Sequence, residues 1–295
     1  MKREHIRIRD PYIVAKDGIY YLYSSTCSAD GTTVEVYRST DLENWDEPTV
    51  VYKLCTDTWK MQDLWAPEVH EYGGKYYMLV SIKGKSGLRG TEISVSDRPD
   101  GMFLPIIDRP STPLTQICID GTLFVENGTP YLVYSRDWSG NYIAEKDIYV
   151  GQICAIELSK DLKESVGEPF LLFESTDVPH SAIAASPTRY KEKTVMRYGS
   201  DAPFINKLNS GKLFLTWSPF PGNNYVVLGA VADTLRGPWT HMEKPLFENN
   251  GGHAMFFTDF DGTKKMCIHQ PEKYLEERAR IFTVTEVGDE LILSC

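Results

Sequence analysis

The chain has 295 residues, a hydrophobic content of 42% and a net charge of −10 from 41 acidic and 31 basic residues. This acidity, with no basic run, excludes the electrostatic hold on phosphates that nucleic-acid binding requires, so a neutral ligand is expected. Six Trp, 17 Tyr and 12 Phe supply a large core and exclude a disordered chain. We expect one domain over residues 1–295, because strand-rich folds reach this length undivided.

The first ten residues, MKREHIRIRD, contain no apolar h-region, and no run of 18 apolar residues follows. We therefore expect no membrane contact, and a cytoplasmic protein as given, or a secreted or periplasmic one if a leader has been removed. No C-x-x-C pair or zinc spacing is present, and a core of this size needs no disulfides, so free thiols are expected. The scattered cysteines are Cys27, Cys55, Cys118, Cys154, Cys267 and Cys295.

In chain order, five segments repeat one pattern, a turn with glycine followed by an aromatic and aliphatic strand. Glycine permits the positive φ of a hairpin turn, and runs of Tyr, Leu, Val and Phe suit buried strands. The turn glycines, separated by 56, 54, 83 and 51 residues, are Gly18, Gly74, Gly128, Gly211 and Gly262. Further strands, expected as blade edges, span residues 34–38, 92–96 and 226–232.

A period near fifty residues predicts repeated sheets, and the lack of a sustained 3.6-residue apolar period predicts little helix. The expected fold class is all-β, a five-bladed β-propeller. The longest interval, 83 residues, holds an insertion, expected at Asp137–Asp147 or at Ser175–Arg197. Long loops on a propeller face commonly shape a pocket, although a solvated loop with no role is an equal alternative.

Short aspartate motifs precede three of the repeats: Arg9-Asp10-Pro11, Ile119-Asp120-Gly121 and Ser200-Asp201-Ala202-Pro203. In a propeller the innermost strand of each blade lines the axis, so acids at the same place in several blades converge on one funnel. An isolated Asp before Pro or Gly is more often a turn former that caps backbone N–H groups. The serial repetition favours one shared carboxylate site.

These motifs, together with Leu64-Trp65-Ala66-Pro67-Glu68-Val69 and Gly251-Gly252-His253-Ala254-Met255, resemble in order the blade signatures of glycoside hydrolase family 43. The resemblance extends from residue 9 to about residue 285. It implies a glycosidase that acts on plant-type pentose glycans, as an α-L-arabinofuranosidase or β-xylosidase, and inverts the anomeric configuration. In an inverting mechanism a base activates water and an acid protonates the leaving oxygen, with about 6.5 to 9.5 Å between the two carboxyls.

By this resemblance Asp10 is the base, Asp120 orients the acid and raises its pKa, and Asp201 stands where the family carries its acid. Asp201 departs from the family pattern, which has a Glu in Glu-Gly-Pro here, and so suggests a subgroup with Asp in place of Glu. Asp is one methylene shorter, which withdraws the carboxyl by about 1.5 Å and disfavours proton transfer without a compensating shift. Asp137, and then Glu68, are reserve candidates for the acid.

Other site predictions concern aromatic residues and a cation. Trp65 and Trp217 are candidate platforms for a sugar ring, with packing between blades as the equal alternative. The resemblance requires no cofactor but allows calcium or another cation near His253, with a simple hydrogen-bonded histidine as the alternative. The expected partner is a carbohydrate, and the sequence does not determine the oligomeric state.

Two other functions stay open at this point. The missing Glu allows a catalytically silent propeller that binds a glycan or a partner. Another five-bladed carbohydrate enzyme is the second alternative, but the Asn-Asp-Pro-Asn and Glu-Cys motifs of fructan-cleaving retaining hydrolases are absent. A mannoside phosphorylase would need a cluster of Arg and His for phosphate, and only Arg136 and Arg197 are candidates.

Overall fold

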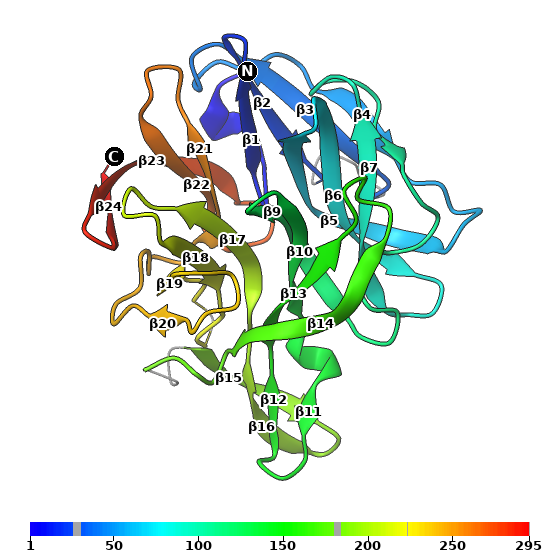
Figure 1. The fold of residues 1–295 in the computed structure, drawn as a ribbon, viewed down its shortest axis with the longest axis vertical. Helices are drawn as coiled ribbons and strands as arrows, with labels where there is room; N and C mark the ends of the chain where they lie inside the picture. The colour runs from blue at the N-terminus through cyan, green and yellow to red at the C-terminus, as the bar shows by residue number, and fades with distance from the viewer. Residues whose placement is uncertain (26–30, 180–183, 223, 295) are drawn as a thin grey trace.

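The computed structural model describes residues 1–25, 31–179, 184–222 and 224–294. Five four-stranded antiparallel sheets form blades around an axis, and a sixth four-stranded sheet projects from the ring (Figure 1). The fold is the five-bladed β-propeller that the fifty-residue repeat predicts. No helix in the described ranges is long and apolar enough to span a bilayer.

The strands of each blade follow one another from the axis outward. Blade 1 contains β1 (Tyr12–Lys16), β2 (Ile19–Ser24), β3 (Thr33–Ser39) and β4 (Thr49–Lys53). Blade 2 contains β5 (Lys60–Tyr72), β6 (Lys75–Gly84), β7 (Arg89–Ser96) and β8 (Leu104–Pro105). Blade 3 contains β9 (Cys118–Glu126), β10 (Thr129–Arg136), β13 (Gln152–Leu158) and β14 (Ser165–Glu174). Blade 4 contains β17 (Asp201–Lys207), β18 (Leu213–Ser218), β19 (Leu228–Ala232) and β20 (Thr240–His241). Blade 5 contains β21 (Gly252–Thr258), β22 (Lys264–Gln270), β23 (Arg278–Val287) and β24 (Glu290–Ser294).

The five predicted glycine turns each join the innermost strand of a blade to its second strand. Their φ angles lie on the positive side, for example 79° at Gly18 and 89° at Gly211, where a side chain would be strained. The predicted edge strands are wrong in one respect, because β3, β7 and β19 are third strands with a further strand outside each. In blades 2 and 4 that outer strand has only two residues, too few to show a pattern in the sequence.

The ring closes through contacts between its first and last blades. The innermost strands β1, β5, β9, β17 and β21 lie side by side in that order, and β1 also lies against β21. Just before β1, the Ile8 N–H donates to the Glu277 carbonyl at 3.0 Å, and Arg7 Nε lies 3.2 Å from Glu277 Oε2. Closure therefore depends on these bonds and on packing, since no blade takes strands from both ends of the chain.

Apolar side chains fill the spaces between neighbouring blades rather than the axis. One cluster joins blades 4, 5, 1 and 2, a second joins blades 3 and 4, and a third joins blades 2 and 3. Tyr23, Tyr134 and Trp217 are fully buried in or beside these clusters. Burying a large apolar side chain contributes about 1.5 to 3 kcal/mol, so this packing holds each innermost strand in place around the funnel.

Both candidate insertion segments join in the sixth sheet, which the two ends of the 83-residue interval build together. Its strands are β11 (Tyr142–Ile143), β12 (Ile148–Val150), β16 (Lys193–Tyr198) and β15 (Ala185–Tyr190), in that order across the sheet. The pair β12 and β16 is parallel. Figure 1 shows this sheet extending beyond the ring from blade 3.

Four of the cysteines, Cys55, Cys118, Cys154 and Cys267, are free thiols as predicted. Burial raises the pKa of the Cys267 thiol to about 12. Cys27 and Cys295 lie outside the described residues.

Candidate active site

At the funnel end of the innermost strands, one residue in each blade has a left-handed backbone. The φ angles are 51° at Asp10, 46° at Ala66, 53° at Asp120, 54° at Ala202 and 58° at His253. In blades 2 to 5 the pairing with the second strand shifts register at this point, which is a β-bulge that re-aims side chains. Such conformations cost about 1 to 3 kcal/mol for a residue other than glycine and cluster at functional sites.

Hydrogen bonds between blades hold four of these five strained residues. In each case the backbone N–H donates to a side chain on the preceding blade. The pairs are Asp10 to His269 Nδ1 at 3.2 Å, Asp120 to Ser81 Oγ at 2.8 Å, Ala202 to Asp120 Oδ2 at 3.0 Å and His253 to Ser218 Oγ at 3.0 Å. Asp120 is the member that uses a carboxylate, so it ties the backbone next to Asp201 to blade 3.

The three aspartates do not occupy one repeated position, which corrects the simplest form of the repeat argument. Asp10 and Asp120 carry the positive φ themselves, whereas in blade 4 Ala202 carries it and Asp201 comes one residue earlier. In this alignment Asp201 corresponds to Trp65 of blade 2 rather than to Ala66. The three carboxyls still reach one cavity, because the positive-φ residue and the residue before it both face the axis.

The three aspartates line one cavity of about 610 Å³ at the centre of the ring. Its wall combines many charged side chains with aromatic and aliphatic ones. The acidic side chains are Asp10, Asp63, Asp120, Asp201, Glu272 and Glu277, the basic ones Arg7, Arg9 and His253, and the aromatic ones Trp65, Tyr225 and Tyr274. The excess of acids means that the buried carboxyls compete for few positive partners.

Asp10 is the carboxyl with the strongest support for its negative charge. Its Oδ1 lies 3.1 Å from His253 Nδ1 and 3.3 Å from His269 Nδ1, and its Oδ2 lies 3.7 Å from Arg9 Nε. Burial alone would raise the pKa of Asp10, but the charges of His253 and Arg9 and the hydrogen bond from His253 hold it well below its usual range. Burial opposes the charge of His253 as well, yet Asp10 raises the pKa of that imidazole to about 9.

Asp120 and Asp201 are shifted in the opposite direction. Burial raises the pKa of Asp120 to about 6, against the charge of His253 and with the charge of Asp10. Burial also raises the pKa of Asp201 well above its usual range, and the negative charges of Asp120 and then Asp137 raise it further. The surroundings therefore favour the ionised form of Asp10 and the protonated form of Asp201.

The two reserve acids lie outside the cavity wall. Asp137 precedes a 3₁₀ turn (Trp138–Gly140) and caps it, since its Oδ1 accepts a 2.9 Å hydrogen bond from the Ser139 N–H. Glu68 is buried, and its Oε2 lies 2.8 Å from His70 Nε2. Asp137 thus combines a capping role with an effect on Asp201, whereas Glu68 belongs to the interior below the funnel.

The two tryptophan candidates differ in their surroundings. Trp65 lines the cavity and is 45% exposed, with the Arg89 guanidinium 3.2 Å from its ring centroid. Trp217 is 0% exposed and packs 5.6 Å from the Phe173 ring in the core between blades 3 and 4. The sugar-platform prediction for Trp217 is therefore wrong, because no ligand reaches a ring enclosed by two sheets.

His253 has the surroundings of a charged hydrogen-bonded residue. Its Nδ1 faces Asp10, and a proton on this nitrogen competes with any cation. Within the described ranges no three or more His, Cys, Asp and Glu side chains are grouped in a way that could hold a metal ion. The described residues therefore do not supply a set of protein ligands for the calcium that the family resemblance allows.

Several cavity residues escaped the sequence analysis. Arg9 was visible in its motif, but its bond to Glu272 Oε1 at 2.6 Å links positions 263 residues apart. Glu272 also lies 2.6 Å from His269 Nε2, and Tyr225 stacks on His269 at 5.3 Å. The sequence pattern around His269 and Glu272 did not mark them as site residues, because a His at a strand end and a Glu after Pro271 are common. Arg136 and Arg197, the phosphate candidates, are not among the cavity residues.

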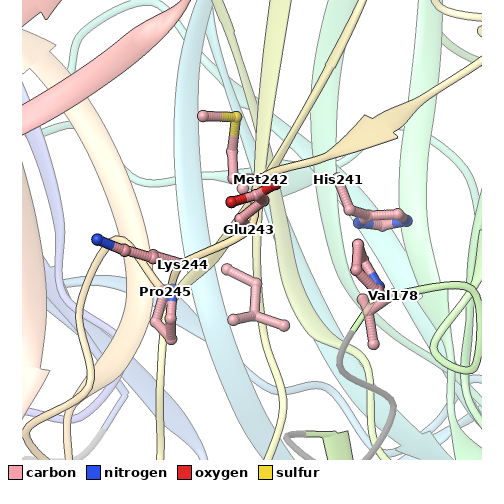
Figure 2. A pocket seen from close by; sticks show the side chains of 9 residues that line it. Val178, His241, Met242, Glu243, Lys244 and Pro245 are labelled. Atoms are coloured by element: carbon pink, nitrogen blue, oxygen red, sulfur yellow. The ribbon is translucent and has the colours of Figure 1, made fainter.

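A second pocket lies on the outer side of blade 4 (Figure 2). Its lining includes Val178, His241, Met242 and Pro245. Its volume is about 10 Å³, roughly the space of a single water, which excludes a sugar. The central cavity remains the candidate site.

Nearly the whole chain is similar to known proteins of one family. The family description "Glycosyl hydrolases family 43" matches residues 5–287. An endo-arabinase from Bacteroides thetaiotaomicron VPI-5482 has a solved structure that is 33% identical, with a TM-score of 0.85 over 98% of both chains.

Curated relatives are more distant. Xylosidase/arabinosidase 43A of Humicola insolens is 28% identical over 46% of each chain. An extracellular exo-α-(1→5)-L-arabinofuranosidase of Streptomyces avermitilis is 23% identical over 90% of this chain and 54% of its own length. The matches span about half the length of these relatives.

Proposed function

Because the chain belongs to family 43 of the glycosyl hydrolases, we propose that it hydrolyses O-glycosidic bonds in pentose glycans. The proposed substrates are α-L-arabinofuranosides or β-xylosides. The names of the similar proteins support this class, since they include an endo-arabinase, an arabinofuranosidase and a β-xylosidase. The partner of the cavity is therefore a carbohydrate.

One observation carries the mechanism: two carboxyls in the same cavity have pKa values displaced in opposite directions. Environments that push two such groups apart assign one as base and the other as acid. Asp10, kept ionised by His253 and Arg9, is the base. Asp201, kept protonated by burial and by its acidic neighbours, is the acid.

In the proposed reaction a water molecule attacks the anomeric carbon from one face of the sugar. Asp10 takes a proton from this water while Asp201 gives its proton to the glycosidic oxygen, so the bond to the leaving group breaks with inversion. Proton exchange with solvent then restores both groups. Asp120 takes no proton in these steps. Its negative charge keeps Asp201 protonated, and the hydrogen bond that it accepts from the Ala202 N–H keeps Asp201 in position.

Asp201 is the acid in this proposal despite its short side chain. It is the blade 4 residue next to the backbone group that Asp120 binds, and it lines the cavity, whereas Asp137 does not. The bulge at the start of β17 sets how far the carboxyl reaches toward the axis. A Glu at this position would carry the carboxyl about 1.5 Å farther.

Leaving-group dependence tests the acid directly. A leaving group such as dinitrophenolate departs without protonation, whereas an alcohol of an oligosaccharide requires it. We expect Asp201→Asn to reduce turnover of arabino- or xylo-oligosaccharides by about 10² to 10⁴, with a much smaller loss on a dinitrophenyl glycoside. Equal losses on both substrates would remove Asp201 from this role.

Product stereochemistry and two controls complete the test. Proton NMR of the first product should show the anomer opposite to that of the substrate. Binding of oligosaccharide by calorimetry without turnover of any arabinoside or xyloside would instead support a silent propeller. Turnover that requires added phosphate would support a phosphorylase and contradict simple hydrolysis.

A further inference from the structure

The sixth sheet carries an aromatic strip, defined here as Trp138, Tyr142, Tyr149 and Tyr190. Tyr142 and Tyr190 stack with centroids 4.2 Å apart, and Tyr149 meets Tyr190 at 5.5 Å and Trp138 at 5.8 Å. The strands bring these rings to one face, because Tyr142 pairs with Tyr149 in the β11–β12 register. Tyr142 also lies 5.1 Å from Tyr149, so the strip is a connected cluster of rings on the projecting sheet.

The rings of the aromatic strip are only partly buried. They keep part of their surface open, unlike the fully buried Tyr134 of blade 3. Polar groups accompany them, since Arg197 lies 4.6 Å from the Trp138 ring and Asp147 pairs with Lys193 at 2.6 Å. Flat apolar rings interleaved with charged and hydroxyl groups suit a ligand that has C–H faces and hydroxyls.

The aromatic strip begins close to the central cavity. A Cβ added to Gly199, two residues before Asp201, would lie 3.8 Å from Trp138 Cδ1 and 3.8 Å from the Phe220 nitrogen. Phe220 stacks at 4.1 Å on Tyr225, which lines the cavity. Trp138 of the strip therefore lies beside the segment that leads to Asp201 and the cavity wall.

The strip is larger than a single sugar ring. Tyr149 lies 5.8 Å from the Trp138 centroid and 5.5 Å from the Tyr190 centroid, so the four ring centroids lie within about 11 Å of one another. A cluster of this size can contact one or two sugar units outside the cavity.

We propose that the aromatic strip binds the continuation of a polymeric glycan whose reacting bond lies in the central cavity, so that this protein prefers polysaccharide to short glycosides. This inference rests on the proposed function for its substrate class. The occupant is a neutral glycan chain. Tyrosine and tryptophan suit such a partner because their rings offer contact area at low entropic cost and their polar tips stay hydrated.

The experiment uses Tyr190→Leu and Tyr149→Leu, which keep apolar volume but lose the flat ring. Phe260→Leu is the matched control, since Phe260 is 47% exposed and lies 4.5 Å from the Tyr20 ring, at the opposite end of the blades. Retardation in native gels containing linear α-(1→5)-arabinan, or xylan, measures polymer binding without any need for turnover. Melting temperature shows that each variant is folded, and either Tyr variant suffices if the other does not fold.

We expect each Tyr variant to bind polymer roughly 3- to 10-fold more weakly, and its preference for polymer over aryl glycoside in kcat/KM to fall by a similar factor. Phe260→Leu should match the wild type. Equal retardation of wild type and Tyr variants, or no retardation of the wild type by either polymer, would overturn the inference. Retardation that the Tyr variants lose, in a wild type that hydrolyses nothing, would support the strip while refuting the proposed hydrolysis.

Discussion

Replacement of Asp10 by Asn tests the electrostatic arrangement of the cavity. In the wild type, Asp10 and then Asp120 and Glu68 raise the pKa of His253 from 6.5 to about 9 against the effect of burial. Because Asp10 is the largest of these three contributions, its replacement should lower the His253 pKa toward 6.5. A fall over this whole range corresponds to about 3 kcal/mol of interaction between His253 and the Asp10 carboxylate. NMR titration, with His253→Gln to assign the resonance, measures it directly.

The same interaction gives a pH-dependent stability with a defined sign. A group whose pKa is higher in the folded state stabilises that state fully below its unfolded pKa and loses this effect as pH rises through the folded value. The free energy of unfolding of the wild type, relative to Asp10→Asn, should therefore fall by about 3 kcal/mol between pH 6 and pH 10. Urea denaturation at the two pH values checks this result.

Activity provides the second readout of Asp10→Asn. Loss of a general base reduces turnover by about 10² to 10⁴, and here the loss should be similar for dinitrophenyl and oligosaccharide substrates, because both need an activated water. A wild-type turnover in the variant would exclude Asp10 as the base. An unchanged His253 pKa would show that the two side chains are not coupled as the 3.1 Å contact implies.

Three further predictions concern the remaining charges. Asp120→Asn removes a charge that raises the pKa of Asp201, so the alkaline limb of the pH profile of kcat/KM should move to lower pH; an unmoved limb would exclude this coupling. Lys60→Met leaves the buried Glu92 carboxylate, 2.9 Å from Lys60 Nζ in the wild type, without its charged partner. The free energy of unfolding should fall by about 3 to 5 kcal/mol, seen as a melting temperature roughly 5 to 8 °C lower, and the double variant with Glu92→Gln should recover part of this stability. Chelation with EDTA should leave turnover unchanged, since His253 pairs with an acid; activity lost to EDTA and restored by calcium would contradict this.

Much of the fold was predictable because it depends on local pattern. A glycine that must adopt positive φ and the aromatic run behind it mark a hairpin wherever they occur, so five of them indicate five blades. The insertion was predicted from spacing, but not that residues 142–150 and 185–198 pair as one sheet. That pairing depends on contacts between strands more than 40 residues apart, which no local signal encodes.

The candidate site was predictable in part for the same reason. Asp10, Asp120 and Asp201 stand in recognisable motifs, and they do line one cavity. The motif could not show that Asp201 lies one residue before the bulge position, or that Glu272 reaches Arg9. Nor could it separate Trp65, which faces the cavity, from Trp217, which two sheets enclose.

The sequence by itself determined the number of repeated units, the strand type and the residues able to do acid–base chemistry, because these follow from periodicity and side-chain identity. Only the tertiary structure decided which charges meet and which are buried. Those two facts set the pKa values, since a carboxyl becomes an acid or a base according to its desolvation and its nearest charges. Both depend on residues brought together by ring closure.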